Sequence, residues 1–581
     1  MLRDVGYLLL LLSVPALILL HLSIAPYTKV EESFHIQAIH DIETYGIPTR
    51  NVKNALRAEY DHFTFPGAVP RTFAGAVALS GLSAPLTGLK HDIDGQFVAR
   101  AILGLFNASS LLYFASALRR AAGKPAAAWY LLFQASQFHV IYYASRTLSN
   151  MFAFGMTTFA LASLLPEPGT SVTYRKRSRV ALYLITMAGI VFRAELALFL
   201  ATHTLFLFAT GCISIQREII PAGISGLVLG LAITLPVDSF FWQRFPLWPE
   251  LAALKFNVVD GQSSAWGVSP WHYYFSNALP RLLLNPLTYL VGIPVALFQP
   301  AARPLANSLL VPSLTYIALY SAQPHKEWRF IVYAIPPLTA AAALGASYIW
   351  TRCTKSVMYR LISLGLIIST LASFLLSSFI LLPASSANYP GAHALNTLHT
   401  HVHNAAPKNT PISVSVHLGN LACQTGVTRF LQQDSPSSSS SSLVSWTYDK
   451  TPPPRLPNPE EVNPAFWSRF DYVVLEPSEA ETLLSLSGQP NEYAHSRKYA
   501  WHPVDSVNGF AGVRFVRPGE EANGRVEEGI IKWVVGEEGK VMGIDVLGMW
   551  RGVRDAIRGV TRGWWVEVKM EERIRILGRV G

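Results

Sequence analysis

Long apolar runs separated by short polar segments dominate residues 1–383. A run of about 20 apolar residues is long enough to cross the hydrocarbon core of a bilayer as a helix. The pattern predicts membrane-spanning helices at about 5–24, 97–118, 126–144, 149–165, 180–194, 195–211, 219–236, 276–298, 304–320, 331–350 and 358–383. We therefore expect a polytopic α-helical membrane protein with about 11 transmembrane helices.

A further apolar stretch, 69–88, is rich in small residues and is interrupted by Pro85. Short basic loops mark the cytosolic side of membrane proteins. If 69–88 crossed the bilayer, the basic cluster at 119–124 would face the opposite side from the other basic clusters. We therefore expect 69–88 to lie on the surface or to dip into the membrane and return. This topology places the N-terminus in the cytosol and 25–96, the first large loop, in the lumen.

The hydropathy falls after Pro383. Short alternating runs such as ISVSVHL (412–418) predict strands, so 384–517 is expected to form a small lumenal α/β domain. A Ser-rich segment, 435–442, is expected to be a disordered loop within it. The remaining residues, 518–581, are read as a charged tail, either an amphipathic helix on the surface or loosely ordered chain.

Composition agrees with the membrane class, because half of the 581 residues are hydrophobic and only 14% are charged. The net charge is +10, but the basic residues gather in short loops between apolar runs, which argues against a nucleic-acid-binding protein. Three cysteines are too few for a disulfide framework or a structural zinc site.

Two adjacent carboxylates, Glu31 and Glu32, follow the first apolar run within ten residues. Charged groups are costly inside lipid, so this pair belongs in water at the membrane surface, where one of them could act as a general base. Acidic residues also favour the first turn of a helix, so the alternative is that the pair only caps the helix that follows.

Basic residues cluster in HKEWRF (325–330), between two predicted spans and on the predicted lumenal side. Arg can bind a phosphate through two parallel hydrogen bonds, and Lys or His adds positive charge. The cluster therefore suits an anionic ligand at headgroup depth, such as a polyisoprenyl phosphate. We predict phosphate binding by His325, Lys326, Arg329 and also Arg193, although Arg193 could instead simply pair with Glu195.

Other polar residues in the lumenal segments are candidate substrate contacts, and Asp238 could alternatively cap a helix. These candidates are Asp61, His62, Arg146, Asp238 and Trp266. Metal-ligand spacings, a Gly-rich phosphate loop and a Ser/His/Asp arrangement do not stand out in the sequence. We therefore expect neither a metal nor a cofactor.

Nine motifs occur in order along the chain: PYTKVEESF, YDHFTFPGAVPRTF, SRTLSN, VFRAEL, VDSFFW, SSAWGVSPWHYYFSNALPR, HKEWRF, NYPG and QTGVTRFL. Together they resemble the dolichyl-phosphate-mannose-dependent mannosyltransferases of the endoplasmic reticulum, over residues 5 to about 475. HKExRF is the broad signature of that family. The first two motifs are similar, more narrowly, to the α-1,6-mannosyltransferases that act on a dolichyl-diphosphate-linked oligosaccharide.

The resemblance implies a GT-C architecture in the endoplasmic reticulum membrane, with the catalytic acid in the first lumenal loop. It implies dolichyl-phosphate mannose as donor, used without an obligatory metal, and inversion at the anomeric carbon in one displacement. The family commonly has Asp followed by Glu where this chain has Glu31 and Glu32. An α-1,2 or GPI-anchor mannosyltransferase remains an alternative, as does a transporter, which would place ionisable residues along a path through the membrane.

Overall fold

The computed structural model describes residues 2–89, 94–166, 171–406, 411–433, 444–454, 463–487, 500–536, 538–541 and 544–579. The chain forms two compact units. The first, called the membrane unit here, comprises Met1–Ser23 and Asp41–Ser378. The second, called the sheet unit, comprises Ile24–His40 and Phe379–Gly581. Helix α2 (Val30–Tyr45) begins in the sheet unit and ends in the membrane unit.

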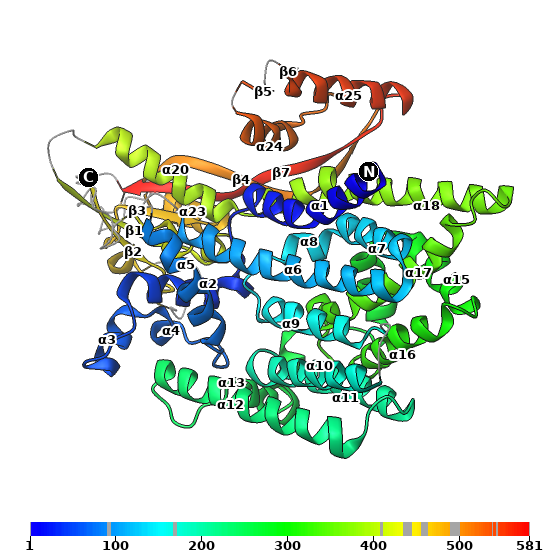
Figure 1. Ribbon diagram of the computed structural model, residues 1–581. Coiled ribbons are helices and arrows are strands. Elements are labelled where there is room, and N and C mark those ends of the chain that lie inside the picture. The colour runs from blue at the N-terminus through cyan, green and yellow to red at the C-terminus, as the bar shows by residue number, and fades with distance from the viewer. Residues whose placement is uncertain are drawn as a thin grey trace. The chain divides into compact units, whose positions relative to one another are not determined.

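The membrane unit is built from helices alone within its described residues (Figure 1). Its elements are α1 (Leu2–Ile24), α3 (Val52–Glu59), α4 (Asp61–Thr64), α5 (Ala74–Leu89), α6 (Gly95–Ala122), α7 (Lys124–Ser136), α8 (Phe138–Tyr143), α9 (Ser149–Leu164), α10 (Ser171–Val191), α11 (Leu196–Ala209), η1 (Ile215–Ile219), α12 (Ile220–Trp242), α13 (Pro249–Leu254), η2 (Lys255–Val259), η3 (Gln262–Trp266), η4 (Tyr274–Ala278), α14 (Leu279–Leu283), η5 (Thr288–Gly292), α15 (Ile293–Phe298), α16 (Arg303–Tyr320), η6 (Trp328–Ala334), α17 (Ile335–Trp350) and α18 (Val357–Leu376).

Five helical stretches in the described part of the chain are long and apolar enough to cross a membrane: Val5–Ile24, Gly95–Ala122, Ile215–Trp242, Trp328–Trp350 and Val357–Ser386. A sixth is reached if Tyr274–Leu283 and Thr288–Phe298, which meet at 109°, are counted as one broken span. The protein is therefore a polytopic α-helical membrane protein. The count of about 11 stays a prediction, because several of the other predicted runs form shorter helices, such as the 14-residue α11.

The structure shows the form of the stretch 69–88 and of the two adjacent predicted runs at 180–194 and 195–211. The stretch 69–88 contains α5, a helix of 16 residues with Pro85 inside it. At 1.5 Å per residue such a helix is about 24 Å long, less than the roughly 30 Å of a hydrocarbon core. The stretch 180–211 contains two helices, because α10 ends at Val191 and α11 begins at Leu196. Arg193 and Glu195 lie in the turn between them.

The sheet unit contains a five-stranded mixed sheet in the order β2-β1-β3-β7-β4. β1 runs parallel to β2 and β3, whereas β7 runs antiparallel to β3 and β4. The strands are β1 (Ile412–Leu418), β2 (Val444–Asp449), β3 (Tyr472–Leu475), β4 (Trp501–Val516) and β7 (Trp565–Arg579), with a small hairpin of β5 (Lys540–Val541) and β6 (Ile544–Asp545). The helices are η7 (Ser377–Leu381), which begins in the membrane unit, α19 (Leu382–Ser386), α20 (Pro390–Ala405), α21 (Asn420–Gln424), η8 (Arg429–Leu431), α22 (Pro464–Trp467), α23 (Pro477–Ser487), α24 (Arg525–Val535) and α25 (Val546–Val560).

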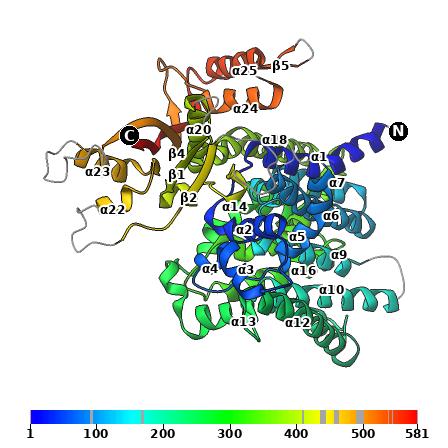
Figure 2. The same ribbon diagram turned by 90° about the vertical axis from the view of Figure 1, so that its left-hand side faces the viewer.

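Helices cover both faces of this sheet (Figure 2). The alternation in ISVSVHL places Val414, Val416 and Leu418 on one face, where they pack with Leu395 and Leu398 of α20. The opposite face packs against α22 and α23 through a second buried cluster: Phe466, Trp467, Phe470, Val473, Leu475, Ala480, Leu483, Trp501 and Leu577.

Residues 518–581 contribute more than the charged tail expected from the sequence. They form α24, α25 and β7, and β7 lies between β3 and β4 with Ile574, Ile576 and Leu577 fully buried. The charged residues of β7 concealed this strand in the sequence, because they interrupt its apolar pattern. The Ser-rich segment 435–442, expected to be disordered, lies outside the described residues.

Candidate active site

A network of polar side chains surrounds the turn between α10 and α11 in the membrane unit. Arg193 donates from Nε to Oε1 of Glu195 at 2.8 Å. Asn150, at the start of α9, donates from Nδ2 to the same oxygen at 3.0 Å and lies 2.9 Å from the Tyr333 hydroxyl. Asn150 also donates to the backbone carbonyl of Arg329 at 3.2 Å. The network thereby joins the VFRAEL and HKEWRF segments, which are far apart in the sequence.

Glu327 organises the HKEWRF loop. Its Oε1 accepts hydrogen bonds from Arg329 Nη2 at 2.5 Å and from His325 Nε2 at 2.9 Å. Burial by itself would raise the pKa of Glu327, but Arg329 and His325 outweigh it and hold the pKa below its ordinary value. The carboxylate is therefore ionised and holds two of the predicted phosphate-binding side chains in one place.

The guanidinium groups of two arginines lie near one aromatic ring. The guanidinium carbons of Arg193 and Arg329 lie 5.3 Å and 5.8 Å from the centroid of Phe330. Arginine stacks on aromatic rings readily, which fixes its planar fork in a defined orientation. The structure thus brings together three of the predicted phosphate-binding residues, Arg193, His325 and Arg329.

Lys326 belongs to the same loop but is turned to backbone groups. Its Nζ donates to the carbonyls of Ser269 at 3.0 Å and Gln323 at 2.5 Å. Only 6% of the residue is exposed, and burial lowers the pKa of its ammonium group. In this structure Lys326 fastens the 267–269 segment to the HKEWRF loop while keeping its charge within the cluster.

Glu250 is a member of this region that sequence reasoning missed. Its Oε2 accepts a hydrogen bond of 2.6 Å from the backbone N–H of Ala194, in the turn between α10 and α11. Burial raises the pKa of Glu250 to about 8; nearby Glu195 adds to the rise, and Arg193 opposes it. A signal was present, since Glu250 directly follows a Pro- and Trp-rich segment and lies in the first turn of the helix α13. Asn150 and Tyr333 were missed as well.

Asp238 is fully buried in α12 and accepts four hydrogen bonds. They come from the Thr72 hydroxyl to both oxygens (3.2 and 2.9 Å), from the Phe73 amide (2.6 Å) and from the Thr234 hydroxyl (2.5 Å). Because α5 begins at Ala74, the carboxylate fastens the residues before that helix to α12. These contacts favour the capping alternative over a direct contact of Asp238 with substrate.

The other candidate substrate contacts lie in different environments. His62 is buried, donates from Nε2 to the Phe241 carbonyl at 2.9 Å, and has its pKa lowered by that burial. The Asp61 amide donates to the Asp41 carboxylate at 2.8 Å, at the start of α4. Arg146 is also buried and lies 4.3 Å from the ring centroid of Tyr142. Trp266, by contrast, is 57% exposed, so of these four residues it is the one most open to a ligand.

The sheet unit carries the carboxylate pair at the start of α2. Glu32 is 2% exposed, and its Oε1 accepts a hydrogen bond of 3.2 Å from the backbone N–H of Lys29. This is the reciprocal bond of a helix capping box, in which the third helical residue reaches back to the N-cap amide. Glu31 is half-buried and is therefore more exposed than Glu32.

The segment that bears this pair is fastened within the sheet unit by the NYPG and QTGVTRFL motifs. Lys29 forms a β-bridge with Thr425, whose carbonyl accepts a hydrogen bond of 3.1 Å from Ala392. The Arg429 amide donates to the Gln37 side chain at 3.0 Å. These contacts explain why short motifs near 390 and 425 accompany the Glu31 motif in the sequence.

The fold and the clustered charges define a membrane glycosyltransferase of the GT-C type. The structure is similar to the crystal structure of ArnT from Cupriavidus metallidurans bound to undecaprenyl phosphate, with a TM-score of 0.53 over 82% of this chain and 94% of that one, at 14% identity. Residues 15–432 match the Alg9-like mannosyltransferase family. The chain therefore belongs to the Alg9-like mannosyltransferase family and is a glycosyltransferase.

Curated relatives from Saccharomyces cerevisiae and Arabidopsis thaliana are both named Dol-P-Man:Man(7)GlcNAc(2)-PP-Dol alpha-1,6-mannosyltransferase. The one from Saccharomyces cerevisiae is 34% identical over 520 residues, which cover 85% of this chain and 86% of the relative. The one from Arabidopsis thaliana is 32% identical and covers 77% of this chain and 83% of its own length.

Proposed function

We propose that this chain transfers mannose from dolichyl-phosphate mannose to the lipid-linked oligosaccharide Man7GlcNAc2-PP-dolichol, forming an α-1,6 linkage. The observation that carries the proposal is the identity of 32–34% to the yeast and plant relatives of that name, over at least 77% of the chain. The clustering of Arg193, His325 and Arg329 around Glu327 and Phe330 supports use of a polyprenyl-phosphate donor, whose anion lies at headgroup depth.

The proposed reaction is a single displacement. The donor is a β-linked mannosyl phosphate and the product an α-linked mannoside, so the anomeric carbon inverts. Glu31 accepts the proton of the acceptor 6-hydroxyl as the oxygen attacks, and Glu32 orients the start of α2. The departing phosphate gains negative charge, which Arg193, His325 and Arg329 stabilise electrostatically. Asp61, His62, Asp238, Trp266 and Arg146 act in substrate binding or in positioning the loops that bind it.

The proposal is tested by measuring mannose transfer by the purified protein reconstituted in lipid. The protein is incubated with dolichyl-phosphate mannose and, separately, with Man7GlcNAc2-PP-dolichol, a shorter lipid-linked oligosaccharide and a mannosylated GPI precursor. We expect transfer to the Man7 acceptor alone, with the new residue released by an α-1,6-specific mannosidase. Transfer to the GPI precursor or formation of an α-1,2 linkage would instead place the chain in another branch of the family.

We further propose that the chain resides in the endoplasmic reticulum membrane, with a cytosolic N-terminus and a lumenal sheet unit. N-glycosylation acceptors inserted in loops test this directly in microsomes. Insertions after Gly46, Trp266 and Pro452 are expected to be glycosylated, and those after Gly123 and Thr354 are not. Glycosylation after Gly123 would contradict the proposal that 69–88 does not cross the membrane.

A further inference from the structure

Helices α24 and α25 form a small projection of the sheet unit, inserted between β4 and β7. They lie side by side in both views and pack against each other (Figures 1 and 2). α25 begins at an Asp545 cap, whose carboxylate accepts a hydrogen bond of 2.8 Å from the Gly548 amide. The reaction proposed above assigns no role to this projection.

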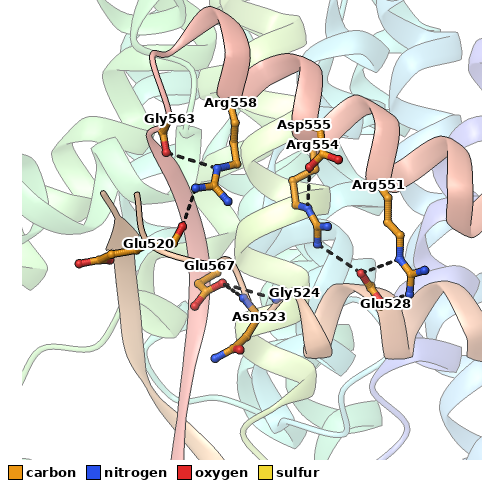
Figure 3. Close-up of polar contacts among 10 residues, drawn as sticks. All are labelled: Glu520, Asn523, Gly524, Glu528, Arg551, Arg554, Asp555, Arg558, Gly563 and Glu567. Atoms are coloured by element: carbon orange, nitrogen blue, oxygen red, sulfur yellow. Dashed lines mark hydrogen bonds and ion pairs between the residues drawn. The ribbon is translucent and has the colours of Figure 1, made fainter. Parts of the chain in front are cut away.

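The arginines of α25 turn toward the rest of the projection (Figure 3). Arg551 donates from Nε and Nη2 to the two carboxylate oxygens of Glu528 on α24, at 3.0 and 2.7 Å, and Arg554 reaches the same carboxylate at 3.2 Å. Arg558 donates to the carbonyls of Glu520 and Gly563, at 2.6 and 3.3 Å. The positive charges therefore lie largely on the inner side of the helix and are engaged there.

The outer side of α25 is an apolar stripe. Met549, Val553, Ile557 and Val560 follow one another at intervals of four, four and three residues, the spacing of one helix face. Their exposed fractions are 62, 48, 42 and 87%. This is the reverse of an ordinary surface helix in water, in which the charged face is outside and the apolar face is covered.

A ring contact links α25 to the end of a membrane-spanning stretch. Trp550 stacks on Phe379, with centroids 5.1 Å apart and ring planes at 8°. Phe379 belongs to Val357–Ser386, the last stretch that is long and apolar enough to cross a membrane in the described part of the chain. α24 also packs against α19, the end of the same stretch. Both contacts lie within the sheet unit and place α25 beside the point where that span ends.

From these observations we propose that α25 lies in the interfacial layer of the bilayer, with the Met549–Val560 stripe inserted among the acyl chains. A lipid surface fits the stripe better than a protein groove does, because α25 adjoins the end of a span and the stripe carries no charged residue. The exposed Arg562 follows the end of the helix by two residues and can reach lipid phosphates. The projection thereby anchors the sheet unit to the membrane.

Spin labels on the full-length protein in lipid vesicles test the proposal. Val553→Cys and its matched control Asp555→Cys, two residues away on the flank of the helix, are made in a chain whose three native cysteines are replaced by Ala. The label at 553 is expected to be accessible to oxygen and shielded from an aqueous nickel reagent, about 5–10 Å below the headgroup boundary. The label at 555 is expected to remain in water.

Equal access of the nickel reagent to both labels would overturn the proposal. Spin–spin broadening at 553 that increases with the protein-to-lipid ratio would overturn it as well, because it would show that the stripe packs against a second copy of the chain. A label on Val560→Cys measures the accessibility of the same stripe at a second position. It is expected to show the same accessibility to oxygen and the same shielding from the nickel reagent as the label at 553.

Discussion

The backbone N–H of Lys29 donates a hydrogen bond of 3.2 Å to the Glu32 carboxylate, and the Glu32 amide donates one of 3.0 Å to the Lys29 carbonyl. Through these two hydrogen bonds, Glu32 caps the first turn of α2. Capping and catalysis, which were alternatives for the carboxylate pair as a whole, can therefore be divided between its members. Glu31 is the better candidate for the base because it is the more exposed of the two.

Glu31→Gln keeps the shape and hydrogen bonding of the side chain but cannot accept a proton. We expect it to lower kcat by about 10²–10⁴-fold, the usual cost of losing a general base, with an unchanged melting temperature. Glu32→Ala should instead lose the capping bond, at a cost of about 0.3–1.5 kcal/mol of stability. Kinetics with dolichyl-phosphate mannose and thermal unfolding of the same preparations measure both effects.

Glu32→Gln is the matched control for this prediction, because its amide oxygen can still accept from the Lys29 N–H. It is expected to retain most of its activity. An inactive Glu32→Gln beside an active Glu31→Gln would reverse the assignment within the pair. If both Gln variants were active, neither residue would be the base.

Arg329→Ala should impair use of the donor. Losing one charge-assisted contact to the donor phosphate costs about 1.5–3 kcal/mol, which corresponds to roughly a 10- to 150-fold loss in kcat/KM for dolichyl-phosphate mannose. Arg303→Ala is the control, since Arg303 donates to the carbonyls of Leu297 and Phe298 at the start of α16. An unchanged kcat/KM for Arg329→Ala would make HKEWRF a purely structural loop.

Glu250 is expected to make stability depend on pH. Its pKa is about 8 in the folded protein, above the ordinary value of 4.5, so the folded state binds the proton more tightly than the unfolded state does. The resulting stabilisation is fully present below about pH 4.5 and is lost as the pH rises through 8. Glu250→Gln, which stays neutral, should lack this loss.

Thermal unfolding midpoints of the wild type and Glu250→Gln between pH 5 and pH 9 measure the difference. We expect the wild-type midpoint to fall relative to that of Glu250→Gln across this range and the gap to level off above pH 8. Parallel midpoints throughout would show that the carboxyl of Glu250 keeps its ordinary pKa.

Local patterns in the sequence were sufficient to predict the membrane class, the division of 180–211 into two apolar runs and the charged loop at 325–330. They could not predict how those charges are used. Lys326 donates to backbone carbonyls, whereas Arg329, three residues later, donates to the carboxylate of Glu327. One of the carbonyls that Lys326 contacts belongs to Ser269, which is 57 positions away in the sequence. Such long-range contacts depend on how the chain folds back on itself.

The position of β7 shows the same limit. Its pairing with β3 joins residues about 100 positions apart, such as Val473 with Leu577, and its charged residues hide the alternation of a central strand. The alternating run of β1, in contrast, has apolar residues at every second position and was predicted as a strand. A strand could thus be predicted where one of its faces is uniformly apolar and was missed where charges interrupt that face.

Gly426 lies where the loop after α21 meets both the start of α20 and the segment leading to Glu31. Its φ is +113°, a value that favours glycine, and an added Cβ would lie 2.7 Å from Cβ of Ala392 and 3.2 Å from Cβ of Tyr27. Gly426→Ala should therefore push the Tyr27 segment away from α20 and displace Glu31, which follows four residues later. We expect lower transfer activity and a lower melting temperature.

Gly512→Ala separates backbone strain from this clash. Gly512 has a φ of +137°, and nothing lies within 4 Å of the position of its Cβ. Both variants should lose about 1–3 kcal/mol to strain, and Gly426→Ala should lose about 1–3 kcal/mol more to overpacking. Only Gly426→Ala should lose activity per folded molecule, because only its clash is transmitted to Glu31. Equal activity in the two variants would show that the Gly426 contact does not position the base.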